Sequence, residues 1–523
     1  MPETAESKEF VRQYHLRTKH HFERYAPGPD RLDWAIEPVS FRRFIGTPYT
    51  RLPMWAADLR TVRYADLFQA GGIVPEPIEK ESVGVLLELS FGLSDWISSG
   101  RFSRPLRCTP SSGNLHPTEI SIALSGVAGI PDGVHHYSSL HHVLEQRCSV
   151  TLPLPGALVG LSSVHWREAW KYGERAFRYC QLDIGHGFAA LRFAAAVLGW
   201  HVRLLDCWSD ADIALFLGLD RQEDFVLADP EAPGLICRVG PETEQTIMPD
   251  PLLSAVTGGQ WYGQVDNRSS VPHPEKWAVI DEVRLATEKP RTELQEISAG
   301  RPASSSAVTS DRTAAALIRQ RRSVRTFDRT GTISAKTLWR LLDATLPRPD
   351  EPPFDAWPYP PRIHLLLFLH RVEGVAPGLF LLPREKTAVG TLRTLMRSDF
   401  LWTVEQESGP VCLYRLLNGD CRQLATAISC YQEMAGNSAL SAGMLAQFDA
   451  ALEEGSWMYR RLFWEAGMIG QVLYLEAEAA GLRGTGIGCF FDDAVHELCG
   501  LQGTACQSLY HFTLGPALNS PEP

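Results

Sequence analysis

The sequence predicts two homologous α+β domains that pair as a pseudo-dimer within one chain. A chain of 523 residues is longer than one ordinary hydrophobic core supports, so two domains are expected. Between Glu288 and Thr313 the sequence is rich in Pro, Ser, Thr and charge, which is typical of a linker. The segments on either side resemble each other. We therefore expect an N-terminal extension over 1–75, a first domain over 76–285, a linker over 286–312 and a second domain over 313–523.

The resemblance between the halves follows one ungapped register of 282 positions. Chance readily matches leucines and alanines, but four glycines in one register indicate an internal duplication. The repeated positions of the first half are Gly173, Arg178, Gly185, Leu191, Ala195, Gly199, Cys207, Asp210, Gly218 and Leu219. Their counterparts are Gly455, Arg460, Gly467, Leu473, Ala477, Gly481, Cys489, Asp492, Gly500 and Leu501.

The first half alternates helix and strand patterns. The first 75 residues show weak periodicity and are expected to wrap the first domain. Apolar residues at helical spacing over 81–97 predict a helix that ends near residues 98–100. A polar stretch, Pro105–Glu119, precedes a strand at EISIAL, and a long apolar helix is stopped by Gly199. A further strand and an acidic helix, DADIALFLGL, follow.

After the linker, AALIRQRRSVRTFD and SAKTLWRLLDATL begin a second helical pattern. Arg321, Arg322 and Arg325 lie close together there, with Ser323 between them. Such a cluster fits a solvated basic turn, or a phosphate site if it stands at a helix start.

Composition and charge exclude several classes of protein. Apolar residues make up 44% and charged residues 21%, as in a globular protein, and the net charge of −11 disfavours nucleic acid. The eleven cysteines include no C-x-x-C pair, so neither a disulfide framework nor a metal site is expected. We find no apolar signal segment and no membrane-spanning run, and expect a cytoplasmic protein without membrane contacts. Histidine pairs at 135–136 and 141–142 flank a predicted loop and are interpreted as surface residues.

Three segments together resemble the FMN-dependent nitroreductase family. RRSVRTF resembles its flavin-phosphate motif, TPSSGNLHPTE its PSSxN segment along the flavin ring, and GLRGTGIGCFFDD its Gly-rich segment near the flavin N5 edge. The resemblance implies FMN as cofactor and domains with a central, mainly antiparallel sheet flanked by helices. It also implies cofactor-binding roles for Arg321, Arg322, Ser323, Arg325, Pro110, Ser111, Ser112, Asn114, Gly488 and Cys489.

SSGNLHPTE and AWKYGERAFRYCQLDIGHGFAA are more specifically similar to SagB-type dehydrogenases, which include azoline dehydrogenases of peptide biosynthesis. That resemblance implies oxidation of an azoline to an azole, with Lys171 and Tyr172 as the catalytic pair. A lysine acts as a base near neutral pH only if burial or positive charge lowers its pKa. Without the resemblance, the same residues fit an amphipathic anchor with a snorkelling lysine. Asp183 and His186 share a helix face and form either a polar relay or a buried packing network.

The motifs are unequally divided, which predicts a single FMN site at the domain interface. The second half lacks a Ser-Ser-Gly-Asn shelf, and the counterpart of Gly488 is Asp206, which would crowd a flavin. The counterparts of the Lys–Tyr pair are Glu453 and Glu454. Two other functions stay open: an NAD(P)H-dependent nitroreductase or quinone reductase, and a non-catalytic scaffold. The expected partners are a small-molecule or peptide substrate and peptide-modifying enzymes.

Overall fold

The computed structural model describes residues 5–54, 61–69, 71–99, 102–154, 156–226, 228–242, 247–266, 277–293, 310–408 and 410–518. Residues 294–309 of the predicted linker lie outside the described residues. Residues 1–4, 55–60 and 70 of the predicted N-terminal extension do so as well.

The first half is built on an antiparallel sheet in the order β11-β7-β6-β5-β8-β10-β9, with β2 also paired to β7. Its strands are β2 Tyr49–Arg51, β5 Thr118–Ser125, β6 Gly133–Ser138, β7 Val143–Ser149, β8 Gly156–Ser163, β9 His201–Leu204, β10 Ala232–Gly240 and β11 Gln260–Trp261. The predicted strand at EISIAL lies within β5. The central strands are buried along nearly their whole length because helices cover both faces of the sheet.

The second half repeats this sheet in the order β17-β18-β16-β14-β19-β21-β20, again antiparallel throughout. Its strands are β14 Ile363–Leu369, β16 Gly378–Leu382, β17 Thr403–Ser408, β18 Val411–Asn418, β19 Leu440–Gln447, β20 Arg483–Ile487 and β21 Cys506–Gly515. Strand for strand, β7-β6-β5-β8-β10-β9 corresponds to β18-β16-β14-β19-β21-β20. The predicted fold class, two tandem α+β domains with antiparallel sheets, is confirmed.

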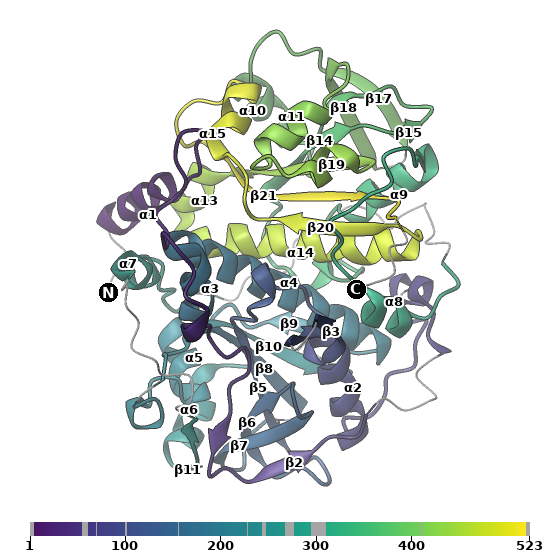
Figure 1. Cartoon of the computed structure of the whole chain (residues 1–523). Coiled ribbons are helices and arrows are strands. Elements are labelled where there is room, and N and C mark those ends of the chain that lie inside the picture. The colour runs from purple at the N-terminus through teal and green to yellow at the C-terminus, as the bar shows by residue number, and fades with distance from the viewer. Residues whose placement is uncertain are drawn as a thin grey trace.

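Helices cover the sheets and fill the space between the halves (Figure 1). Those of the first half are α1 Ala5–Arg17, α2 Lys80–Phe91, α3 His165–Tyr172, α4 Ala176–Val197, α5 Asp210–Leu217 and α6 Pro249–Thr257. Those that follow are α7 Ala278–Ala286, α8 Ala314–Gln320, α9 Ala335–Ala344, α10 Ala388–Leu395, α11 Arg422–Ile428, α12 Glu433–Asn437, α13 Phe448–Glu454, α14 Met458–Ala479 and α15 Asp492–Cys499. None of the helices in the described ranges is long and apolar enough to span a bilayer.

Short strand pairs complete the architecture: β1 Phe44–Ile45 with β12 Gln264–Val265, β3 Leu93–Ser99 with β4 Phe102–Arg107, and β13 Ile333–Ser334 with β15 Val372–Glu373. The helix predicted over 81–97 is therefore too long. It ends at Phe91, where the Gly92 N–H closes the last turn on the Glu88 carbonyl, and residues 93–99 pair as a strand. The interpretation of the two histidine pairs as surface residues is wrong for His135, His136 and His142. His135 and His136 are buried in β6, and His142 is buried with its Nδ1 2.9 Å from Tyr137 Oη; His141 is exposed.

One repeated pair of glycines, Gly185 and Gly467, lies at the contact between α4 and α14, which run side by side through the centre of the molecule (Figure 1). A Cβ atom on Gly185 would come within 2.2 Å of the Trp464 carbonyl oxygen. A Cβ atom on Gly467 would come within 2.3 Å of the Leu182 carbonyl oxygen. Only glycine allows the two backbones to approach so closely, so the pair marks the pseudo-twofold axis of the chain.

Reciprocal ion pairs link the halves around this axis. Arg178 Nη2 donates to Asp492 Oδ1 at 2.8 Å, and its counterpart Arg460 donates to Asp210 Oδ2 at 2.6 Å. All four side chains are buried, and each aspartate opens a helix, α15 or α5. The interface is therefore isologous, as in a symmetric dimer, although it lies within one chain.

Helices α1 and α7 are a second pair of related elements, and they contact each other. The His20 N–H that follows α1 donates to Asp492 Oδ2 at 3.0 Å, and the Lys289 N–H that follows α7 donates to Asp210 Oδ2 at 3.0 Å. The residues after each helix therefore cover the opposite end of the interface. The N-terminal residues contribute to the pairing of the domains and do not only wrap the first one.

Candidate active site

The Pro-Ser-Ser-Gly-Asn segment forms a half-buried shelf anchored to α4. Asp183 of α4 accepts hydrogen bonds from the Ser112 N–H and from Ser112 Oγ, both at 3.2 Å. Ser111 Oγ accepts from the His116 N–H at 2.8 Å, and Asn114 Nδ2 donates to the Pro105 carbonyl at 3.0 Å. Burial raises the pKa of Asp183 to about 7. Asp183 thus holds the shelf, whereas His186 bridges to the second domain through Gln471 and Tyr510.

The Lys–Tyr pair at the end of α3 reaches the centre of this shelf. A Cβ atom on Gly113 would lie 2.7 Å from Tyr172 Oη and 3.0 Å from Lys171 Nζ, so both head groups converge on this glycine. Burial lowers the pKa of Lys171, and the positive charges of Arg104 and Arg325 lower it further. Burial also raises the pKa of Tyr172 well above its usual value. The structure therefore combines an amine of lowered pKa with a phenol of raised pKa, although Glu168 partly opposes the lowering at Lys171.

The turn after β20 approaches this pair through Tyr179. The Gly488 carbonyl accepts hydrogen bonds from Tyr179 Oη at 3.0 Å and from Arg175 Nη2 at 3.2 Å. The Tyr179 ring lies 4.6 Å from the Tyr172 ring, centroid to centroid. Because the peptide bond is trans and planar, the Cys489 N–H points away from the side on which Tyr179 and Arg175 hold the carbonyl. In the described part of the chain, neither the Gly488 N–H nor the Cys489 N–H donates a hydrogen bond.

The arginine cluster stands at the end of α8 and not at a helix start, so no helix dipole assists it in holding an anion. Arg321 is buried, and its Nε donates to the Cys108 carbonyl at 2.9 Å. Arg322 pairs with Asp95 at 2.7 Å. Ser323 shares a 2.7 Å hydrogen bond with Tyr474 Oη but is exposed. Arg325 is exposed and has no hydrogen bond or ion pair to any residue that the structure describes.

The structure thus brings residues of both halves to one place. The shelf, the Lys–Tyr pair and the Gly488–Cys489 peptide meet around Tyr172 and Tyr179. Arg325 lies close enough to affect the pKa of Lys171. Arg321 fixes the carbonyls of residues 107 and 108, so it connects the second domain to the chain that leads into the shelf. Arg321 and Arg322 are engaged with protein groups, and of the three arginines in this cluster only Arg325 has no hydrogen bond or ion pair to a described residue.

Sequence reasoning missed three residues of this site. Tyr179 and Arg175 hold the Gly488 carbonyl, and no short-range sequence pattern indicated this contact. Glu168 is fully buried beside Lys171, and its carboxyl oxygens have no hydrogen-bond partner in the described ranges. Burial raises the pKa of Glu168 well above its usual value. The paired Arg178–Asp492 and Arg460–Asp210 contacts had a signal, since both residue types recur in the 282 register.

Charged side chains fill the pseudo-symmetric counterpart of this site. Asp206, which replaces Gly488, is buried and paired with Arg461 at 3.0 Å. Lys289 is also buried there and donates to the Asp206 carbonyl and to Thr292 Oγ1. At this counterpart an ionic network thus stands in the place of the Tyr179 ring and the Gly488–Cys489 peptide.

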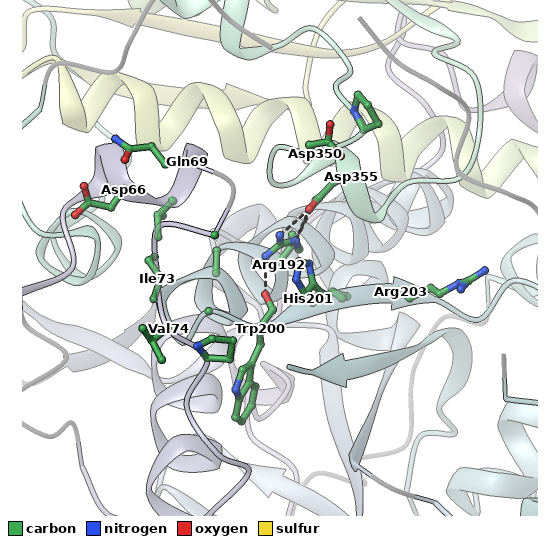
Figure 2. A pocket seen from close by; sticks show the side chains of 17 residues that line it. Asp66, Gln69, Ile73, Val74, Arg192, Trp200, His201, Arg203, Asp350 and Asp355 are labelled. Atoms are coloured by element: carbon green, nitrogen blue, oxygen red, sulfur yellow. Dashed lines mark hydrogen bonds and ion pairs between the residues drawn. The ribbon is translucent and has the colours of Figure 1, made fainter. Parts of the chain in front are cut away.

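Two cavities lie elsewhere. A cavity of about 740 Å³ is bordered by Arg192, Asp355, Trp200 and His201, and Arg192 and Asp355 are paired at 2.6 Å (Figure 2). Another, of about 690 Å³, is lined by Asp210, Trp277 and other residues of α3, α5 and α7. Neither is lined by a predicted site residue. Among the described residues no group of three or more His, Cys, Asp or Glu is arranged to hold a metal ion.

Comparison with known proteins identifies the fold. A crystal structure of a candidate nitroreductase from Anabaena variabilis superposes on 97% of this chain and 99% of its own, with a TM-score of 0.69 and 20% identity. The chain has the nitroreductase fold. Because the match runs through both halves, the two proteins share the tandem form of the nitroreductase fold.

Two curated relatives match part of the sequence. The trifolitoxin-processing protein TfxB of Rhizobium leguminosarum bv. trifolii is 29% identical over 146 residues, which cover 24% of this chain and 39% of TfxB. A candidate nitroreductase of Methanocaldococcus jannaschii is 25% identical over 138 residues, which cover 24% of this chain and 66% of that protein. The matched part is thus less than two thirds of either relative's length. No protein-family model matches the chain.

Proposed function

We propose that this protein is an FMN-dependent oxidoreductase of the SagB type that oxidises an azoline to an azole. The observation that carries the proposal is the convergence of Lys171 Nζ and Tyr172 Oη on Gly113, beside the Gly488–Cys489 peptide. A proton acceptor and a proton donor thus stand at the shelf. TfxB is named as a protein that processes trifolitoxin, which supports a substrate that is modified on the way to a toxin. We propose that this substrate is peptide-borne and that partner enzymes modify the same peptide.

The donor set fits FMN. The exposed guanidinium of Arg325 and the hydroxyl of Ser323 would hold the phosphate, with the Arg322 backbone next to them. Pro110, Ser111, Ser112 and Asn114 would lie along the ring. The unused N–H groups of Gly488 and Cys489 offer donors to a carbonyl or ring nitrogen. When bound, FMN would supply a two-electron acceptor at this site.

The chain's own residues then handle the proton. With its pKa lowered by burial and by the charges of Arg104 and Arg325, Lys171 accepts the proton that the azoline ring carbon loses. Tyr172 keeps its proton because burial raises the pKa of its phenol, so it can donate a hydrogen bond to the heteroatom of the ring. Glu168 lies beside Lys171 and opposes this lowering of the Lys171 pKa, but the effects of burial and of the two arginines are larger together.

The alternative enzyme is a nitroreductase or quinone reductase that takes electrons from NAD(P)H. The Methanocaldococcus relative, named as a candidate nitroreductase, favours it. Steady-state NADPH oxidation with a nitroaromatic or quinone acceptor distinguishes the two. Turnover on these acceptors without turnover on azolines would replace the proposed function by this one.

The test is azoline oxidation by the FMN-loaded protein, with and without Lys171. Lys171→Ala should lower turnover on a thiazoline peptide by about 10²- to 10⁴-fold, the range of a general base, while flavin absorbance is unchanged. Lys336→Ala, which changes an exposed lysine on α9, is the matched control and should retain full turnover. Equal turnover by the two variants would refute the role of Lys171 as the base.

A further inference from the structure

Two cysteines stand face to face beside the candidate active site. Cys489 Sγ lies 2.8 Å from Cys430 Sγ, a separation too short for two independent thiols and longer than the 2.05 Å of a disulfide bond. Both residues are half-buried and so within reach of small solutes. They come from different elements, since Cys430 follows α11 and Cys489 follows β20. The fold therefore presents a dithiol and not an isolated cysteine.

Hydrogen bonds on either side of the sulfurs hold the two turns together. Gln432 Nε2 donates to the Cys489 carbonyl at 3.0 Å, and the Phe491 N–H donates to the Ile428 carbonyl at 2.7 Å. In addition, Cys430 and Tyr431 have φ values of 52° and 58°, a left-handed conformation that is uncommon for residues other than glycine. Two such residues in succession indicate that the turn is held in this shape by its surroundings. The short sulfur–sulfur approach is thus a fixed feature of the fold.

The surroundings make the two thiols unequal. The hydrogen bond between the two sulfurs and the nearby Arg175 guanidinium lower the pKa of Cys489 against the opposing effects of burial and Asp492. The same hydrogen bond and burial raise the pKa of Cys430. A thiolate is the nucleophilic form of cysteine, so Cys489 is the attacking sulfur and Cys430 the resolving one.

We propose that Cys430 and Cys489 are a peroxide-responsive dithiol that closes reversibly to a disulfide. The Cys489 thiolate attacks a peroxide oxygen; the O–O bond breaks, hydroxide leaves, and Cys489 becomes a sulfenic acid. The Cys430 thiol then attacks Cys489 Sγ, the S–O bond breaks, water leaves, and the disulfide forms. In total the two thiols lose two electrons and two protons, and hydrogen peroxide becomes two molecules of water. A small dithiol such as dithiothreitol restores the pair by exchange.

The other cysteines provide a matched control. Of the eleven, only Cys412, Cys430 and Cys489 are half-buried, and the remaining eight are buried. Cys412 lies on β18, and no cysteine partner is recorded for its sulfur in the described ranges. Cys412→Ser therefore removes a thiol of similar exposure without removing the pair.

The experiment treats the purified full-length chain with hydrogen peroxide, before any flavin or substrate is added, so that it is independent of the proposed function. Peptide mapping should show one linked peptide pair, 430 with 489, and the count of free thiols should fall by two. Dithiothreitol should restore both thiols. Cys412→Ser should form the same link. Cys430→Ser should instead accumulate a sulfenic acid at Cys489, trapped by dimedone, whereas Cys489→Ser should leave Cys430 a thiol under the same dose.

Three outcomes would overturn the inference. One is the absence of the 430–489 linked peptide at a dose that oxidises free cysteine completely. Another is equal sulfenic acid labelling of the remaining cysteine in the Cys430→Ser and Cys489→Ser variants. The third is a link that dithiothreitol does not reverse in the folded protein. Because none of these measurements uses the reaction on azolines, a negative result leaves the proposed function standing, and the converse also holds.

Discussion

Replacing Gly113 by alanine tests the geometry of the Lys–Tyr pair directly. The new methyl group would lie 2.7 Å from Tyr172 Oη and 3.0 Å from Lys171 Nζ, whereas ordinary contact begins at 3.4 Å. The two head groups must therefore retreat by about 0.7 Å and 0.4 Å, respectively. Because both atoms end flexible side chains, they can move at little cost in stability, but the base and the donor leave their positions.

The magnitude follows from two separate terms. Gly113 has φ = 60°, and an alanine held in the left-handed region costs about 1–2 kcal/mol of the free energy of unfolding. A displacement approaching 1 Å at reacting groups costs about 100-fold in rate, or about 2.7 kcal/mol of transition-state stabilisation. Gly126→Ala is the matched control, since Gly126 has φ = 72° and a Cβ atom there meets nothing within 4 Å.

The assay combines urea unfolding with turnover on a thiazoline peptide. Both variants should lose a similar free energy of unfolding, and both should bind FMN. Only Gly113→Ala should lose turnover, by about 100-fold. If Gly113→Ala and Gly126→Ala turn over at the same rate, Lys171 and Tyr172 do not act at Gly113, and the argument from their convergence fails.

Three further predictions follow from individual contacts. Arg325→Ala should weaken FMN binding by about 10- to 100-fold in a fluorescence titration, because it removes an unpaired guanidinium. The control Arg329→Ala, which breaks an exposed ion pair, should leave the affinity unchanged. Equal affinities of the two variants for FMN would contradict the phosphate role of Arg325. Burial raises the pKa of Asp183 to about 7, so between about pH 4 and 7 the folded chain holds a proton that the unfolded chain has lost. The contribution of Asp183 to stability therefore falls as pH rises through this window. Asp183→Asn should flatten the dependence of the free energy of unfolding on pH there, measured by urea unfolding. An unchanged slope in the variant would show that the Asp183 carboxyl titrates normally. Arg460→Ala leaves Asp210 buried without its partner and should cost about 3–5 kcal/mol in the free energy of unfolding, and a loss below 1 kcal/mol would contradict the isologous pairing of the halves.

The duplication was predictable because its strongest signal is a packing requirement. Gly185 and Gly467 are glycines in both halves since α4 and α14 touch there, and no other residue fits. The same register does not reach α1 and α7. These helices are related by 269 positions and share few residues beyond Leu16 with Leu285 and Thr18 with Thr287. Insertions between these helices and the remainder of each half break the 282-position register in which the other repeated residues are found.

Local patterns predicted elements better than their ends or environments. The apolar spacing over 81–97 continues past Phe91, although the chain turns into strand β3, because helical periodicity does not register a pairing with a distant strand. His136 reads as a polar loop residue, yet it lies buried between Glu119 at 2.9 Å and Glu145 at 3.0 Å, which raise its pKa to about 9. Both partners lie on other strands, so the sequence next to His136 does not indicate them.

The candidate site shows the same limit. The segments that contain Asn114, Lys171 and Gly488 could be proposed from short motifs, and the structure brings all three segments together. The tertiary contacts that organise them could not: Tyr179 reaches Gly488 across the domain interface, and Cys430 meets Cys489 from 59 positions away along the chain.

The central claim is that the duplicated chain keeps one composite FMN site between its halves, with the counterpart closed by Asp206, Arg461 and Lys289. The most direct test is the number of FMN molecules per chain, measured by native mass spectrometry of the reconstituted full-length protein and by the absorbance of released flavin. The account predicts one FMN per chain, lost at low flavin concentration in Arg325→Ala. Two FMN molecules per chain, or none at saturating flavin, would contradict it.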